Sequence, residues 1–146
     1  MTIFEDNRIY ILDGAMGTMI QKAGLTEEDY HDGPFAGCVK ELKGNSECLN
    51  LTRPEIIRSI HKEYIAAGVG IIETNTFSAN VPAVERDGIY STEEVIKAAV
   101  RLARQATEGT DVKFYLSFGP LSALLAPYGK LTEEECRDIY RCMMKA

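Results

Sequence analysis

The chain has 146 residues, of which 45% are hydrophobic and 26% charged, with a formal net charge of −6 at neutral pH. This length predicts one domain or less. Basic residues do not form blocks, which argues against a nucleic-acid or anionic-membrane partner, because either needs a clustered positive face. No apolar run approaches the roughly 20 residues that span a bilayer, and residues 1–6 lack the pattern of a secretory signal. A cytoplasmic location is therefore expected.

Four cysteines occur, at Cys38, Cys48, Cys136 and Cys142, and none belongs to a C-x-x-C pair. This argues against a zinc ribbon or a thioredoxin-like motif. Cys136 and Cys142 are too far apart around a helix to face one metal ion. Free thiols in a reducing compartment are predicted.

Residues 8–12 contain the apolar run Ile-Tyr-Ile-Leu, which Asp13-Gly14 closes. Such a run, ended by a turn signal, predicts a buried parallel strand. Residues 15–23 are expected to form a short helix that stops at Gly24. Residues 24–51 are rich in glycine and predict a long irregular loop, which in a compact domain is usually functional or mobile.

A second helix and then a second strand follow. Thr52-Arg53-Pro54-Glu55 has the pattern of a capping box, with proline in the first turn, and predicts the start of a helix. That helix is expected to end at Gly68 and to bury Ile56, Ile57, Ile60, Tyr64 and Ala67. Residues 69–72 then predict a β-branched strand that ends at Glu73-Thr74-Asn75.

The next helix is expected to begin with a capping box at Ser91-Thr92-Glu93-Glu94 and to stop at Gly109. Residues 112–117 predict the next strand. Thr132-Glu133-Glu134-Glu135 opens a last helix that is expected to turn inward Cys136, Ile139, Tyr140, Met143 and Met144.

Strands separated by long helical crossovers predict an α/β fold with a parallel sheet. Three strands cannot close a barrel, and a complete (β/α)8 TIM barrel takes about 250 residues. Residues 1–146 are therefore predicted to be one partial domain, the N-terminal three βα units of an incomplete barrel.

Polar side chains follow each predicted strand and define the candidate site. In parallel α/β folds the carboxyl ends of the strands meet on one face, so these groups should converge. An aspartate there could hold a substrate ammonium, and a glycine amide could donate to a carboxylate. The candidate substrate-binding residues are Asp13, Gly14, Glu73, Thr74, Asn75 and Ser117.

Structural interpretations of the same residues remain open. Asp13-Gly14 is a common turn former, Glu73 could pair with a base on a neighbouring strand, and Gly119-Pro120 could only set the direction of a loop. Residues 13–18 contain glycine but lack both G-x-G-x-x-G and the P-loop lysine, which disfavours a phosphate site. His31 and His61 lack partners at metal-ligand spacing, and His61 is expected at the surface or boundary of its helix.

Three ordered motifs carry a resemblance that spans nearly the whole chain: residues 11–18 (ILDGAMGT), 48–55 (CLNLTRPE) and 67–77 (AGVGIIETNTF). They resemble the opening of the homocysteine-binding module of cobalamin-dependent methionine synthases, within the homocysteine S-methyltransferase family. Phe118-Gly119-Pro120, followed by residues 126–129 (APYG), resembles the segment after the third strand of that module.

The resemblance implies a TIM barrel of methionine biosynthesis in which zinc presents the homocysteine sulfur as a thiolate to a methyl donor. Asp13 and Gly14 would bind the amino-acid end of homocysteine, with Thr74 assisting at the carboxylate. Glu73, Asn75 and Ser117 are carried over as residues that shape the pocket or touch the ligand. The zinc ligands of the family, including a Cys-Cys pair after Gly-Gly, are absent from this sequence. The resemblance tilts the methyl donor toward methylcobalamin, bound by another domain or protein.

Three functions are compared. In the first, the chain is the N-terminal part of a homocysteine S-methyltransferase, inactive alone, whose partner is the remaining barrel half or a corrinoid protein. In the second, it is a non-catalytic partial barrel that binds a ligand or closes its edges as a homo-oligomer. In the third, it is a different α/β enzyme that uses Asp13 and Glu73 as acid and base.

Overall fold

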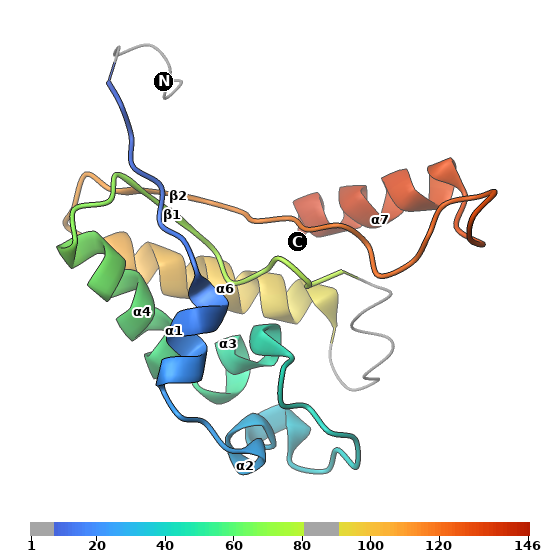
Figure 1. Ribbon diagram of the computed structural model, residues 1–146, viewed down its shortest axis with the longest axis horizontal. Coiled ribbons are helices and arrows are strands. Elements are labelled where there is room, and N and C mark those ends of the chain that lie inside the picture. The colour runs from blue at the N-terminus through green and yellow to red at the C-terminus, as the bar shows by residue number, and fades with distance from the viewer. Residues whose placement is uncertain (1–7, 81–90) are drawn as a thin grey trace.

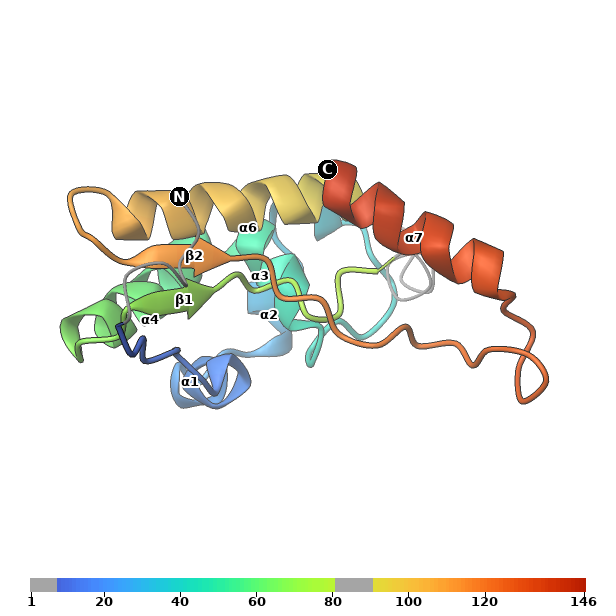
Figure 2. The same cartoon turned by 90° about the horizontal axis from the view of Figure 1, so that it is seen from above.

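The computed structural model describes residues 8–80 and 91–146. It is an α/β structure in which helices pack beneath a small parallel sheet and the last helix lies at the opposite end of the molecule from α4 (Figures 1 and 2). The elements in chain order are α1 (Met16–Lys22), α2 (Glu27–Tyr30), the 3-10 helices η2 (Gly33–Phe35) and η3 (Ser46–Cys48), α3 (Leu49–Thr52), α4 (Pro54–Ala66), β1 (Ile71–Glu73), α6 (Thr92–Thr107), β2 (Lys113–Tyr115) and α7 (Glu133–Lys145).

The sheet pairs β1 and β2 in parallel, with Ile72 opposite Phe114. The chain ahead of α1 runs along the other side of β1. There Leu12 forms an isolated parallel bridge with Ile71, and the amide of Asp13 donates to the Ile71 carbonyl at 3.0 Å. The prediction of a parallel α/β sheet is confirmed, but the first of its three predicted strands is reduced to this bridge.

The prediction that residues 8–12 are buried is wrong. Ile9 is 96% exposed, Ile11 63% and Leu12 48%. Within the described residues, this segment has strand pairing only toward β1, so its apolar side chains lie at an open edge of the sheet.

The predicted capping box at Thr52 is also wrong. Thr52 is the last residue of α3, Arg53 is the N-cap of α4, and no side chain caps that helix. The Thr52 hydroxyl is buried without a hydrogen-bond partner among the described residues. The reason is that α3 occupies the positions where the capping residue was expected, so that Arg53 makes the break between two successive helices.

Two other predicted helix starts are confirmed. In α6 the Ser91 hydroxyl accepts from the Glu94 amide at 3.1 Å, and in α7 Thr132 accepts from Glu135 at 3.2 Å. Both are complete capping boxes, because the glutamate in turn accepts from the amide of the capping residue. The predicted stops after α1, α4 and α6 are glycines with positive φ, a conformation that glycine adopts without steric strain.

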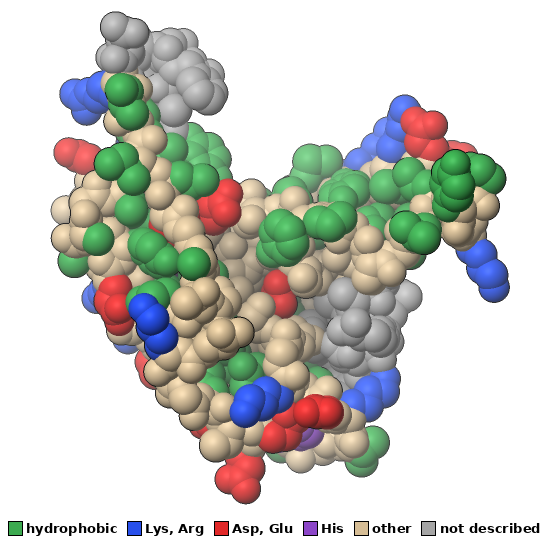
Figure 3. Space-filling view, in the orientation of Figure 1, with side chains coloured by type: hydrophobic (Ala, Val, Ile, Leu, Met, Phe, Trp, Pro, Cys, Tyr) green, Lys and Arg blue, Asp and Glu red, His purple; other side chains and the backbone are tan. Residues whose placement is uncertain are grey.

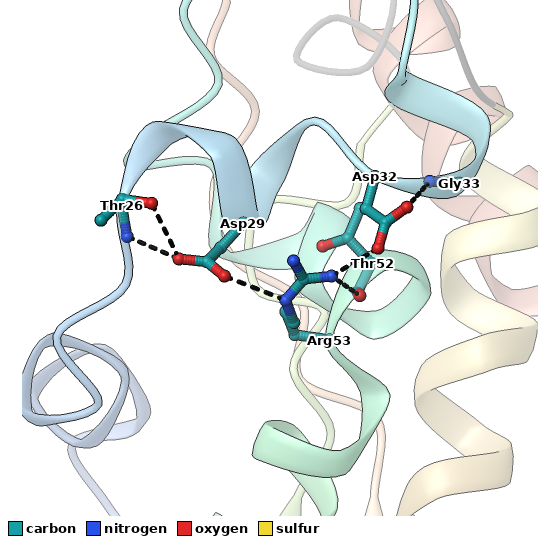
Figure 4. A network of polar contacts seen from close by, with 6 residues as sticks. All are labelled: Thr26, Asp29, Asp32, Gly33, Thr52 and Arg53. Carbon is teal, nitrogen blue, oxygen red and sulfur yellow. Dashed lines mark hydrogen bonds and ion pairs between the residues drawn. The ribbon is translucent and has the colours of Figure 1, made fainter.

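The region predicted as a long loop contains α2, η2, η3 and α3, and Arg53 joins its parts (Figure 4). The Arg53 guanidinium donates from Nε to Asp29 at 3.1 Å, and from Nη1 to Asp32 at 2.8 Å and to the Thr52 carbonyl at 2.7 Å. The hydrogen bond from Arg53, with that from the Gly33 amide, lowers the pKa of Asp32. One planar cation thereby ties α2 and η2 to the start of α4.

The core lies in three clusters of buried side chains. The first packs α1, the short helices and α4 around Phe35, Leu49 and Ile57. The second lies under the sheet at Ile72 and Ala103, and the third joins α6 to α7 through Met143.

Three further predictions of side-chain burial need correction. Ala67, expected on the buried face of α4, is exposed at the end of that helix. Met143 is fully buried as expected, but its neighbour Met144 is 62% exposed. His61, expected at the surface or boundary, has no exposed surface. In the part of the chain that is described, no helix is long and apolar enough to cross a membrane.

Candidate functional site

A cavity of about 340 Å³ opens at the carboxyl ends of the strands, where polar residues were predicted to converge. All six predicted site residues line it, although they come from three separate stretches of the sequence. The lining consists of Asp13, Gly14, Ala15, Met16, Gly17, Ser46, Glu47, Glu73, Thr74, Asn75, Phe77, Ser78 and Ser117.

Asp13 is the acidic residue of the first stretch, and it is held against the end of β1. Its side chain accepts a hydrogen bond from the Glu73 amide at 3.0 Å. Burial raises the pKa of Asp13 to about 6; the nearby charge of Glu73 adds to the rise, and the hydrogen bond from the Glu73 amide opposes it. A half-buried carboxyl in this state would gain from a cation bound beside it.

Gly14 and Ala15 carry the chain from Asp13 into α1. A Cβ placed on Gly14 would meet no heavy atom within 4 Å, so the space beside its backbone is open. Ala15 has a φ of 22°, which is rare for a residue with a side chain. The backbone is therefore bent sharply at the wall of the cavity, where Gly14 presents main chain without a covering side chain.

Thr74 and Ser117 are joined in a closed ring of hydrogen bonds beneath the cavity. The Ser117 amide donates to the Thr74 hydroxyl at 3.2 Å, and the Thr76 hydroxyl donates to the Ser117 carbonyl at 2.8 Å. The Thr74 and Thr76 hydroxyls are 2.6 Å apart, so the Thr74 proton is directed to Thr76. Thr74 thus fixes one strand end to the next, and its hydroxyl proton is already donated within the protein.

Glu73 pairs with a hydroxyl rather than with the base that one interpretation of the sequence predicted. The Ser117 hydroxyl donates to Glu73 Oε2 at 3.3 Å, across the ends of β1 and β2. Glu73 remains exposed toward the cavity, whereas Ser117 is half-buried. The pair therefore brings together two of the predicted site residues.

Asn75 is buried and points toward residues that the sequence analysis did not single out. Its side-chain amide donates to the Ser46 carbonyl at 2.8 Å and to Asn50 Oδ1 at 3.3 Å, and Asn50 donates back to the Asn75 carbonyl at 2.8 Å. Glu47, also missed, lines the cavity and is only 4% exposed. The available signal was that these residues fall in the irregular region expected to be functional.

Gly119, in the predicted loop after β2, permits a close approach to Phe77. Its amide donates to the Phe77 carbonyl at 2.8 Å, and an added Cβ would lie 2.6 Å from that oxygen and from a ring carbon of Phe77. The Tyr140 hydroxyl of α7 donates to the Gly119 carbonyl at 2.9 Å. Gly119 thus sets the position of a side chain that forms part of the cavity wall.

The cavity has an acidic lining. Asp13, Glu47 and Glu73 contribute carboxyl groups, and no lysine, arginine or histidine is among the described residues that line it. In a partly desolvated cleft such a set of groups favours a cationic ligand group.

A metal centre does not fit these residues. Nowhere in residues 8–80 and 91–146 do three histidine, cysteine, aspartate or glutamate side chains gather closely enough to hold a metal ion. All four cysteines are free thiols, and none of them lines the cavity.

A family model described as homocysteine S-methyltransferase matches residues 10–146, almost the whole chain. The chain belongs to the homocysteine S-methyltransferase family. The family resemblance found in the sequence is thereby confirmed.

The fold is similar to that of the homocysteine methyltransferase MmuM from Escherichia coli. The match to its metallated form has a TM-score of 0.72 at 24% identity and covers 96% of this chain and 50% of that chain. The match to the oxidised form has a TM-score of 0.55 at the same identity and covers 77% of this chain and 37% of that chain. The chain thus spans about half the length of the family member it matches.

Proposed function

We propose that this chain forms the part of a homocysteine S-methyltransferase barrel that holds the amino-acid end of homocysteine while its thiol is methylated. The observation that carries the proposal is the cavity at the strand ends, which all six predicted site residues line. Family membership supports homocysteine as the ligand.

The lining suits a zwitterionic amino acid. The Asp13 carboxylate would accept from the ligand ammonium, with Glu47 and Glu73 adding negative potential. The ligand carboxylate would lie at the exposed backbone of Gly14, where no side chain intervenes. Thr74, Asn75 and Ser117 would fix the shape of the cavity, because their polar groups bind one another and the neighbouring chain.

Activation of the thiol is assigned to the rest of the barrel. A free thiol with a pKa of about 8.5 is mostly protonated at neutral pH, so a methyltransferase must favour its thiolate. The described residues offer no metal cluster, and the ionisable groups of the cavity lining are carboxyl groups, which are weaker bases than a thiolate. Zinc, the methyl donor and any corrinoid partner would therefore act from strands or domains outside this part.

Calorimetric titration with three small molecules tests the proposal. Homocysteine and homoserine share the amino-acid end and should bind with similar affinity, whereas 4-mercaptobutanoate, which lacks the ammonium, should bind at least about 10-fold more weakly. Equal binding of all three, or no binding of homocysteine by the folded chain, would contradict the proposal.

The alternative of a non-catalytic partial barrel that oligomerises is favoured by the apolar side chains at the open edge of the sheet, where Ile9 and Ile11 are exposed. Light scattering tests it. A stable oligomer without homocysteine affinity would support this function, whereas a monodisperse folded monomer would exclude closure of the edges by self-association.

A further inference from the structure

Residues 74–78 follow β1 and are here called the cavity loop. All of them except Thr76 belong to the wall of the cavity. The preceding stretch of residues 46–50, here called the clasp segment, lies against it. We infer that Glu47 is a positioning residue that holds the far end of the cavity loop in the shape that homocysteine needs. This inference rests on the proposed function for the identity of the ligand, but the contact itself stands without it.

Glu47 makes two hydrogen bonds of different kinds. Its Oε1 accepts from the Ser78 amide at 2.7 Å, and its Oε2 accepts from the Ser46 hydroxyl at 3.0 Å. The residue is 4% exposed, so the carboxylate has given up most of its contact with water. Removal of either partner from so buried a group is costly, because water cannot replace the lost hydrogen bond fully.

The neighbouring asparagines bind the middle of the cavity loop to the same segment. Asn50 donates to the Asn75 carbonyl at 2.8 Å, and Asn75 donates to the Ser46 carbonyl at 2.8 Å. Both asparagines are buried. The clasp segment therefore grips the loop at Asn75 and Ser78, two positions on either side of Phe77.

The near end of the cavity loop has a separate anchor. Thr74 and Thr76 are bound to Ser117 by the ring of hydrogen bonds across β1 and β2, in which Glu47 takes no part. Loss of the Glu47 contact should therefore loosen the loop at Ser78 and leave it fixed at Thr74. This gradient separates a local positioning role from general destabilisation of the fold.

The far end matters for the cavity because Phe77 and Ser78 belong to its lining. A loop that is free at Ser78 samples several positions, and the ligand must then select one of them, which reduces its apparent affinity. Glu47 would thus act on homocysteine through the position of the loop rather than mainly through its own charge.

Two substitutions separate these effects. In Glu47→Ala both hydrogen bonds are lost. In Glu47→Gln the side-chain carbonyl can still accept from the Ser78 amide, and the amide can donate to the Ser46 hydroxyl, but the charge is removed. Glu63→Ala, which removes an exposed glutamate on α4, is the control for the loss of one acidic residue.

Amide hydrogen exchange in the ligand-free protein is the first measurement. In Glu47→Ala, exchange at Ser78 should accelerate about 10-fold or more, while amides at Thr74 and in α6 keep their wild-type rates. Glu47→Gln should stay within about 3-fold of wild type at Ser78, and Glu63→Ala should show no change. Unchanged exchange at Ser78 in Glu47→Ala, or uniform acceleration throughout the chain, would overturn the inference.

Homocysteine titration is the second measurement. The dissociation constant for homocysteine should rise about 10-fold in Glu47→Ala. In Glu47→Gln it should return most of the way to the wild-type value. If Glu47→Gln binds homocysteine as weakly as Glu47→Ala although exchange at Ser78 is normal, the charge of Glu47 and not the position of the loop determines affinity. That result would overturn the positioning role. If the wild-type protein does not bind homocysteine, the proposed function fails, and the exchange rates alone still decide whether Glu47 holds the loop.

Discussion

Asp13 and His61 are ionisable residues whose pKa values are shifted in opposite directions by burial. The pKa of Asp13 rises to about 6 and that of His61 falls to about 4, in both cases chiefly because desolvation disfavours the charged form. Asp13 lines the cavity, whereas His61 lies within the helical layer on α4. The same physical cause therefore gives two different dependences of stability on pH.

For Asp13 the raised pKa means that the folded chain holds a proton that the unfolded chain has released. Its contribution to stability is present below pH 3.8 and is lost as the pH rises through about 6. Asp13→Asn should remove this loss, so that its stability relative to wild type increases between pH 4 and pH 6. Chemical denaturation across that range measures the difference, and a constant difference would contradict the shift.

Binding should follow the opposite course to stability at Asp13, because only the carboxylate attracts an ammonium. The affinity of the wild-type protein for homocysteine should increase as the pH rises through about 6. Asp13→Asn should bind about 10-fold more weakly and without this dependence. An Asn variant that retains the wild-type affinity would show that Asp13 serves only as a turn former.

For His61 the lowered pKa means that the unfolded chain binds the proton first as the pH falls. Stability should be full above pH 6.5 and should decline toward pH 4, by on the order of 3 kcal/mol. Neither ring nitrogen has a hydrogen-bond partner within the described structure. His61→Phe should therefore flatten the acid limb of the stability profile without loss at pH 7; an acid limb that persists in this variant would contradict the assignment.

The sequence predicted the place of Asp13 but not that of His61, and the reason is local. Asp13 directly follows an apolar run and precedes a glycine, a local pattern that marks where the chain turns even though the run itself forms only one bridge to β1. His61 lies four residues after Ile57, on the same helix face, so the helical period did point inward. The prediction placed His61 at the surface because histidine is polar, although the helical period indicated the buried face. Its burial depends on tertiary packing that composition does not reveal.

At the scale of elements, local signals determine the helices more firmly than the strands. Ser91 and Thr132 start helices because each satisfies an orphan amide within four residues of itself. Thr52 has the same sequence pattern, but it is the last residue of α3. A four-residue motif does not indicate whether another helix already includes its first residue. The prediction of a buried strand at residues 8–12 is wrong for a similar reason, because strand pairing depends on neighbours that are distant in the sequence.

Gly119 gives a prediction for the loop after β2. Gly119→Ala would place a Cβ against the backbone oxygen of Phe77, which cannot move as a flexible side chain can. The substitution should destabilise the chain by about 1–3 kcal/mol and weaken homocysteine binding through Phe77. Gly37→Ala, where an added Cβ meets open space, is the control. Equal melting temperatures for the two variants would contradict the close approach.

At the scale of the whole molecule, apolar side chains are exposed along the two ends of the layered structure. Hydrophobic groups are visible along the N-terminal segment and around α7 (Figure 3). The exposed large hydrophobic side chains of residues 8–12 and 124–144 include Ile9, Ile11, Leu12, Leu124, Tyr128 and Met144. The proposed function predicts that further strands and helices of a barrel cover these faces, and the match over half of a methyltransferase is consistent with that prediction.

Residues 8–12, which run along the open edge of the sheet, therefore allow the stability of the isolated chain to be measured separately from barrel assembly. Ile11 is 63% exposed, so Ile11→Lys should change the stability of the chain by less than about 0.5 kcal/mol. Once further strands pack beside it, the same lysine would be buried without a partner, at a cost of several kcal/mol.

The measurement is association with a polypeptide that carries the remaining βα units of a family member, followed by titration calorimetry. Wild type should bind it, and Ile11→Lys should bind at least about 100-fold more weakly. Val39→Lys is the matched control, because Val39 is 99% exposed and lies in the region between η2 and η3, away from the strand edge. If both lysine variants associate like wild type, the open edge is not where the barrel closes.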